Sequence, residues 1–110
     1  MPVILIADDS STARLIIRRC VEIAGGAEAT LLEARDGQQA LDLVRQQHVD
    51  IVLTDINMPV LDGTRLLMHI KSNPRLNETR VVVISSMGNP ALEKELKDIG
   101  ADAVIPKPVT

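Results

Sequence analysis

Five short runs of apolar residues recur along the chain, and segments whose apolar positions have helical spacing separate them. The runs lie at residues 3–7, 30–34, 51–54, 81–84 and 103–105. Most of them are apolar at consecutive rather than alternate positions, which is typical of strands that are covered on both faces. The alternation of such strands with helices predicts an α/β fold built on a parallel sheet.

The longest helical segment follows the first run. Its apolar positions have the spacing i, i+3, i+4, i+7, i+8 and i+11, and they are Ala13, Ile16, Ile17, Cys20, Val21 and Ala24. This spacing predicts one apolar stripe that faces the core, with charged residues opposite to it. The charged residues are Arg14, Arg18, Arg19 and Glu22. Gly25-Gly26 predicts the end of this helix.

Three shorter helices are expected in the remaining segments. Their apolar positions are Ala40, Leu41 and Val44 in the second helix, Leu66, Leu67 and Ile70 in the third, and Leu92, Leu96 and Ile99 in the fourth. Asp36-Gly37 and Asn89-Pro90 are typical helix starts, and Asn73-Pro74 and Gly100 are typical stops. Because the fourth helix has a thin apolar stripe, we expect it to be more exposed than its neighbours. Its charged outer face is then either solvated or available to a partner.

Composition narrows the function classes. The chain has 110 residues, a formal net charge of -3 and no Phe, Tyr or Trp, so it predicts one domain with an aliphatic core. Without aromatic rings or a basic surface, nucleic acid is not expected as a direct partner. The single Cys20 cannot form an intrachain disulfide, and the first apolar run is too short to cross a membrane. We therefore expect a cytoplasmic protein, and assign no metal-binding role to His48 or His69.

Polar residues follow four of the five predicted strands. They are Asp8-Asp9, Asp55, Ser85-Ser86 and Lys107. Because parallel strands end at the same edge of a sheet, these side chains are expected to lie close together. Crowded carboxylates favour a hard divalent cation, Mg²⁺ above all, and a lysine and a hydroxyl beside it suit a phosphoryl group. One aspartate would then be the nucleophile that forms an acyl phosphate.

These residues resemble the receiver domain of two-component response regulators, the chemotaxis-type phosphoacceptor domain. The resemblance runs from Val3 to Pro108. It rests on Asp8-Asp9, on Leu-Thr-Asp-Ile-Asn-Met-Pro-Val-Leu-Asp-Gly at residues 53–63, on Val-Ile-Ser-Ser at 83–86, and on Lys107-Pro108. It implies a flavodoxin-like doubly wound sheet of five parallel strands in the order 2-1-3-4-5.

The resemblance also implies a role for each acidic residue. Asp55 is expected to be the phosphoacceptor. Asp9 and Asp55, with the backbone carbonyl of Asn57, would bind Mg²⁺ or alternatively Mn²⁺, and Asp8 would hold the metal through water. Lys107 would pair with the phosphoryl group.

Further roles implied by the resemblance concern switching and hydrolysis. Ser85 would be the switch hydroxyl, with Ser86 next to it in the phosphoryl-binding region. Asn57 and Met87 occupy the positions that tune the attack of water on the acyl phosphate. The bond between Lys107 and Pro108 is expected to be cis.

The chain departs from the family at two places. The family places an aromatic residue on the fifth strand whose ring moves with the switch hydroxyl, and the position here is Val104. Receivers also continue into a fifth helix, whereas only Val109-Thr110 follow Lys107-Pro108. We therefore expect residues 1–110 to form a receiver domain that lacks its C-terminal helix. It would be the N-terminal part of a longer protein or a truncated form, or a partner chain, as in a dimer, would cover the gap.

The function that follows is a signalling switch in a phosphorelay. A histidine kinase or phosphotransfer protein would phosphorylate Asp55, and the surface around the fourth helix would then control a target protein or output domain. The domain would be no enzyme beyond catalysing its own phosphorylation and dephosphorylation. One alternative is an interaction module with a vestigial metal site. A phosphatase would want a second acid where Asn57 stands, and a flavin would want a ring to stack on.

Overall fold

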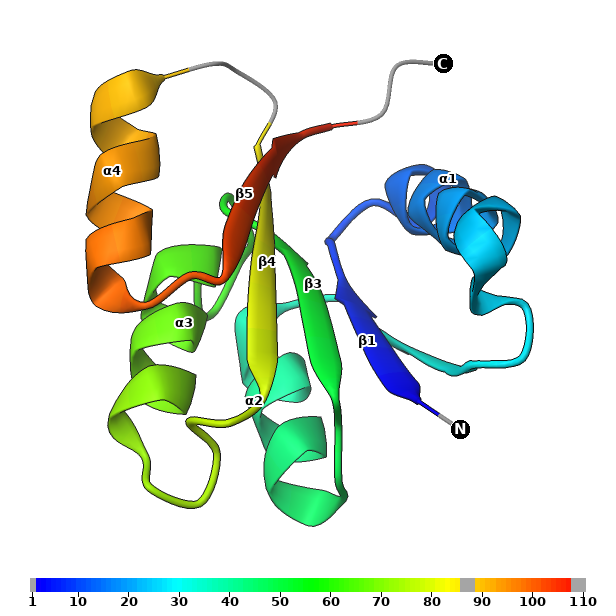
Figure 1. The fold of residues 1–110 in the computed structure, drawn as a ribbon, viewed down its shortest axis with the longest axis horizontal. Coiled ribbons are helices and arrows are strands. Elements are labelled where there is room, and N and C mark those ends of the chain that lie inside the picture. The colour runs from blue at the N-terminus through cyan, green and yellow to red at the C-terminus, as the bar shows by residue number, and fades with distance from the viewer. Residues whose placement is uncertain (1, 86–88, 108–110) are drawn as a thin grey trace.

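The computed structural model describes residues 2–85 and 89–107. Five parallel strands form one sheet in the order β2-β1-β3-β4-β5, which confirms the fold class and strand order implied by the resemblance (Figure 1). The strands are β1 (Val3–Ala7), β2 (Thr30–Ala34), β3 (Ile51–Asp55), β4 (Arg80–Ser85) and β5 (Ala103–Pro106). The helices are α1 (Ser11–Val21), α2 (Gly37–Gln46), α3 (Gly63–Ser72) and α4 (Pro90–Ile99), and a π-helical turn, η1 (Glu22–Gly26), continues α1.

Each of the four helices begins at a residue whose side chain caps it. The capping residues are Ser10, Asp36, Asp62 and Asn89, and each accepts a hydrogen bond from the backbone N–H three residues later. A cap of this kind is worth about 1 kcal/mol, because it satisfies a helix N–H that has no partner within the helix. The helix starts predicted at Asp36-Gly37 and Asn89-Pro90 are confirmed.

The two faces of the sheet are covered unequally. The helices α2, α3 and α4 lie on one face, whereas α1 lies on the other (Figure 1). Side chains such as Leu5, Val52 and Val83 form the larger core with the first group of helices. Their neighbours Ile6 and Ile84 point to the opposite face, where a small cluster with Ile17 of α1 is buried. The main core therefore lies on the side of three helices.

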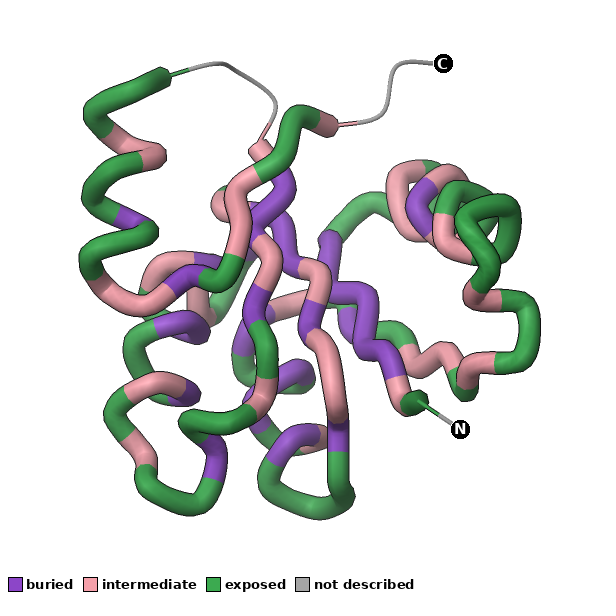
Figure 2. Tube along the Cα trace, viewed as in Figure 1, coloured by how far each residue is buried: buried purple, intermediate pink, exposed green. Residues whose placement is uncertain are grey.

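The apolar stripe expected along α1 is only partly buried, which corrects the sequence prediction. Ile17 is buried, but Cys20 and Ala24 at the far end of the stripe are exposed. In Figure 2 the exposed colour, green, predominates along the end of α1 and the turn that follows it. The helix widens into η1 from Glu22, which shifts Ala24 out of line with the stripe, whereas Cys20 still lies within α1. On the same face of the sheet, Ile105 of β5 is 43% exposed. Among the described residues, α1 alone covers this face.

The exposure predicted for α4 is confirmed. Leu96 is its one buried residue within the described part of the chain. Its outer face carries two i,i+4 ion pairs, Glu93 with Lys97 and Lys94 with Asp98. No helix among the described residues is long and apolar enough to cross a bilayer.

Candidate functional site

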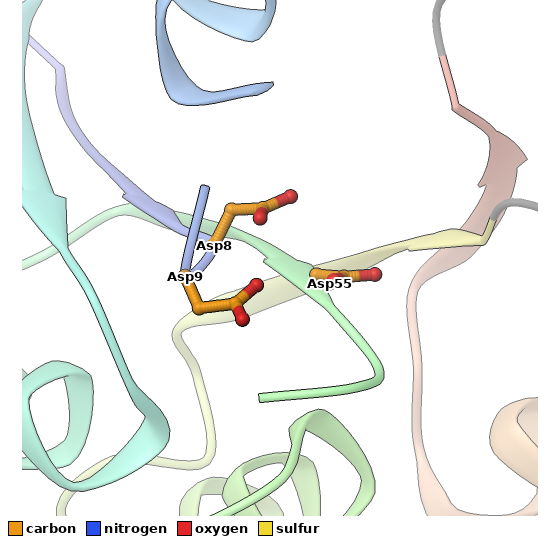
Figure 3. A group of neighbouring side chains, drawn as sticks. All are labelled: Asp8, Asp9 and Asp55. Carbon is orange, nitrogen blue, oxygen red and sulfur yellow. The ribbon is translucent and has the colours of Figure 1, made fainter. Parts of the chain in front are cut away.

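Three carboxylates gather at the carboxyl edge of the sheet. Asp8 and Asp9 directly follow β1, and Asp55 is the last residue of the neighbouring strand β3 (Figure 3). One carboxylate oxygen from each residue lies within 4.8 Å of those of the other two. The prediction that parallel strands bring these residues together is confirmed.

Asp8 is completely buried and is held at several atoms. Its backbone N–H donates to the carbonyl of Ala34 at 3.1 Å, and its Oδ1 accepts from the backbone N–H of Ser10 at 3.0 Å. Its Oδ2 lies 3.2 Å from Nζ of Lys107. The geometry of that contact is poor, so Oδ2 has an ion pair but no hydrogen bond among the described residues. A buried carboxylate oxygen that lacks a hydrogen bond is costly, and a metal-bound water would satisfy it.

Asp55 is buried beside another acid. Its Oδ1 accepts from the backbone N–H of Ile56 at 2.9 Å, and its Oδ2 lies 3.4 Å from Nζ of Lys107. Burial raises the pKa of Asp55, and the charge of Asp8 raises it further, while Lys107 and the Ile56 N–H oppose this increase. These surroundings therefore destabilise the ionised form of Asp55.

Lys107 places the one ammonium of the site between two carboxylates. Its backbone N–H donates to the carbonyl of Ser85 at 2.7 Å, which ties the end of β5 to the end of β4. Burial by itself lowers the pKa of Lys107, but Asp8 and Asp55 outweigh burial and raise it. Lys107 therefore carries a positive charge at neutral pH.

The described site has an excess of acid. Three carboxylates against one ammonium leave two negative charges when all four groups are ionised, and the charge of the nearby Arg14 is paired with Glu33. A divalent cation balances this excess, and oxygen ligands are those that Mg²⁺ and Mn²⁺ prefer. The residues present, including the buried Asp8 oxygen without a hydrogen bond, fit such a cation.

The loop between β3 and α3 is packed too tightly to accept added atoms. A Cβ on Gly63 would overlap the carbonyl oxygen of Asp55, and one on Gly37 would overlap that of Leu61. Val60 has a φ of 70°, at the centre of a γ-turn closed by a 2.8 Å hydrogen bond from Leu61 to Pro59. A β-branched residue is strained there, and such strain collects at functional sites.

The remaining predicted residues divide into two groups. Asn57 lies exposed in this loop, and Ser85 and Val104 line a cavity of about 230 Å³ between α4 and β5. Leu92 and Leu96 form its other wall. The predictions for Ser86, Met87 and the peptide bond to Pro108 lie outside the described residues.

Comparison with known proteins identifies the family. The model of the response regulator receiver domain matches residues 4–110. The chain belongs to this family. It is similar to a probable chemotaxis protein CheY of Rhizobium etli, with 31% identity over 97% of this chain and 81% of the relative. As predicted from the sequence, the family is one of two-component signalling.

Solved structures agree with this assignment. The receiver domain is similar to the Mn²⁺-bound form of response regulator Rcp1, with a TM-score of 0.87, 26% identity, and coverage of 100% of this chain and 84% of that one. It is also similar to the phosphorylated cyanobacterial phytochrome response regulator RcpA, with a TM-score of 0.88, 26% identity, and coverage of 99% and 82%.

One residue that contacts the site escaped the sequence analysis. The sequence places Arg14 only opposite the apolar stripe of its helix, yet its Nη1 donates to the backbone carbonyl of Asp8 at 2.7 Å. A usable signal was present, because a cation in the first turn of a helix is opposed by the helix dipole and needs a partner.

Proposed function

We propose that this receiver domain accepts a phosphoryl group on Asp55 in a reaction that depends on Mg²⁺. The observation that carries the proposal is the uncompensated acid at the carboxyl edge, where Asp55 stands beside Asp8 and shares one ammonium with it. A purely structural cluster would be expected to balance its buried charges. An excess of acid that faces solvent through Asp9 suits a site that is completed by a cation.

Each residue has a defined part in the transfer. A carboxylate oxygen of Asp55 forms a bond to phosphorus while the bond from phosphorus to the donor's leaving atom breaks. The leaving group departs with the electron pair and takes a proton from solvent, and Asp55 becomes an acyl phosphate. Lys107 would pair with a phosphoryl oxygen. Asp9 and Asp55, with the backbone carbonyl of Asn57, would hold the metal, and Asp8 would hold it through water. When bound, Mg²⁺ supplies positive charge against the phosphoryl oxygens.

The product stays on the protein, so we propose a stoichiometric acceptor rather than a turnover enzyme. A histidine kinase or phosphotransfer protein would be the donor, in the cytoplasm. The similarity to a Mn²⁺-bound response regulator supports the proposed metal binding, and the similarity to a phosphorylated one supports the proposed phosphorylation. The ion and the modification belong to those proteins.

Switching would spread from Asp55 to the surface around α4. A hydrogen bond from Ser85 to the charged phosphoryl group is worth about 1.5–3 kcal/mol, less than the roughly 5.5 kcal/mol that reverses a 1:99 population. Contacts of Lys107 and the metal must supply the remainder. The cavity of about 230 Å³ beside Ser85 and Val104 offers space for side chains to rearrange without a moving ring. The rearranged α4 surface would then bind a target protein or output domain.

The test is to incubate the protein with Mg²⁺ and acetyl phosphate and then to measure its intact mass. We expect one labile phosphoryl group per chain in the wild type and none in Asp55→Asn. Asp102→Asn is the matched control, because it removes an acid at the opposite edge of the sheet and should leave the adduct in place. Absence of the adduct with acetyl phosphate and with phosphoramidate would support an interaction module instead. Repeated turnover of unrelated phosphate esters would support an enzyme.

A further inference from the structure

The side chain of Arg14 connects α1, β2 and the acidic site. Its Nη1 donates to the backbone carbonyl of Asp8 at 2.7 Å, and its Nε lies 2.9 Å from Oε1 of Glu33 on β2. The Arg14 side chain is only 12% exposed, although α1 presents it on its polar side. A second arginine, Arg18, lies 3.3 Å from the other oxygen of Glu33 but is 39% exposed.

The position of Arg14 is unfavourable for a cation on its own. Its backbone N–H donates to the carbonyl of Ser10, the N-cap residue, so Arg14 lies at the positive end of the helix dipole. Glu33 compensates for this position. The planar guanidinium can then hold a carboxylate and a carbonyl at the same time, which a lysine ammonium does with less geometric definition.

The carbonyl that Arg14 binds belongs to the peptide unit between Asp8 and Asp9. Because a peptide unit is planar, a hydrogen bond to this carbonyl orients the backbone from which both acids project. The other backbone hydrogen bond of Asp8, from its N–H to Ala34, fixes the preceding peptide unit. The two contacts together constrain the peptide units on both sides of the Asp8 Cα.

We propose that Arg14 is a positioning residue for the divalent-cation site. Glu33 holds the Arg14 side chain. Arg14 in turn fixes the peptide unit between Asp8 and Asp9 and so orients their two carboxylates toward the cation. This inference rests on the proposed function, because it requires that the acidic cluster bind a metal. Mutation of a residue that hydrogen-bonds to a metal ligand weakens metal affinity by about 10–100-fold. The effect of losing a hydrogen bond to the backbone of a ligand should lie near the lower end of that range.

The test measures Mn²⁺ affinity by water proton relaxation in the wild type, Arg14→Gln and the matched control Arg18→Gln. Both variants lose one contact with Glu33, but only Arg14→Gln loses the contact with Asp8. We expect about 10-fold weaker binding in Arg14→Gln and a change below about two-fold in Arg18→Gln. Arg14→Lys keeps the positive charge but lacks the planar guanidinium, so its affinity for Mn²⁺ should be intermediate.

Urea unfolding of the same variants separates positioning from stability. If Arg14→Gln lowers stability but binds Mn²⁺ as the wild type does, the inference is overturned. Full recovery in Arg14→Lys would also overturn it, because charge alone would then suffice. A wild type that binds no Mn²⁺ would overturn the proposed function as well, so the two failures are distinguishable. Should Arg14→Gln not fold, Glu33→Gln loosens the same contact and is expected to weaken Mn²⁺ binding.

Discussion

Two lysines meet aspartates at opposite edges of the same sheet, and their surroundings differ. At the amino edge, Nζ of Lys71 lies 2.9 Å from Oδ2 of Asp102 and donates to the carbonyls of Asn77 and Thr79. Asp102 Oδ2 also accepts from the backbone N–H of Val81 at 2.8 Å. In this pair one ammonium meets one carboxylate, and Arg80 adds a second positive charge near Asp102. At the carboxyl edge, one cation faces an excess of acid.

The pKa values of the two aspartates shift in opposite directions. Burial would raise the pKa of Asp102, but the Val81 N–H and the Lys71 ammonium lower it. Burial raises the pKa of Asp55, and Asp8 adds to the increase. The balanced pair stabilises the fold by itself, whereas the unbalanced cluster carries an electrostatic cost that a bound cation would remove. This contrast distinguishes a structural ion pair from the proposed cation site within one small domain.

The largest effect is expected from adding a methyl group at the carboxyl edge. In Gly63→Ala the new Cβ would overlap the backbone of Asp55, and overpacking against a rigid backbone costs about 3 kcal/mol. In Gly100→Ala at the amino edge, the Cβ would meet only the flexible chain of Lys71 at 3.0 Å, although a φ of 130° still strains alanine. We expect about 1–2 kcal/mol for that variant.

Urea unfolding followed by far-ultraviolet circular dichroism measures both changes, since the chain has no aromatic residue for fluorescence. Equal losses of unfolding free energy in Gly63→Ala and Gly100→Ala would show that the carboxyl edge is no more tightly packed than the amino edge.

The next effect comes from removing each lysine. Lys71→Met removes one donor from two carbonyls and from Asp102, which keeps only the Val81 N–H, and should cost about 2 kcal/mol. Lys107→Met leaves Asp8 and Asp55 to repel each other and should cost a similar amount, about 2 kcal/mol, without metal. Millimolar Mg²⁺ should restore much of the loss in Lys107→Met and none in Lys71→Met.

The comparison of unfolding free energies with and without Mg²⁺ decides this point. If Mg²⁺ restores the stability of both lysine variants equally, it acts through general screening of charge. The proposed difference between the two edges would then be wrong.

The smallest effects on stability are expected from neutralising Asp55 and Asp102. One change should stabilise the fold and the other should destabilise it. Asp55 has a raised pKa in the folded state, so its charge costs stability above its ordinary pKa, and Asp55→Asn should gain about 1 kcal/mol at neutral pH without metal. Asp102 has a lowered pKa, so its contribution is present above its ordinary pKa and is lost as the pH falls through the folded value. Because its side chain is 40% exposed, Asp102→Asn should lose no more than about 1 kcal/mol.

Unfolding free energies between pH 3 and 7, in steps of about one unit, show the two trends directly. The difference between wild type and Asp102→Asn should shrink as the pH falls. A stabilising effect of Asp102→Asn at neutral pH would contradict the account of the amino edge.

Much of this architecture was predictable from local sequence. Helix starts at Asp36 and Asn89 depend on capping side chains within three residues, and the strands depend on short apolar runs, so both are visible without the fold. The convergence of Asp8, Asp9 and Asp55 was predictable because parallel strands share an edge.

Other features depend on contacts far apart in the sequence. The burial of Arg14 requires Glu33, nineteen residues away, which its own helix does not reveal. The partial exposure of the α1 stripe depends on how little of that sheet face the described helices cover. The ion pair of Lys71 and Asp102 joins residues 31 positions apart.

The most direct test of the central claim is the stability that Mg²⁺ adds to the wild type and to Asp55→Asn. Each is unfolded in urea with EDTA and again with Mg²⁺. At ten times its dissociation constant, a cation bound only to the folded state adds about 1.4 kcal/mol. The account predicts a gain of this size in the wild type and a much smaller one in Asp55→Asn. Equal gains in both proteins, or none in the wild type, would contradict it.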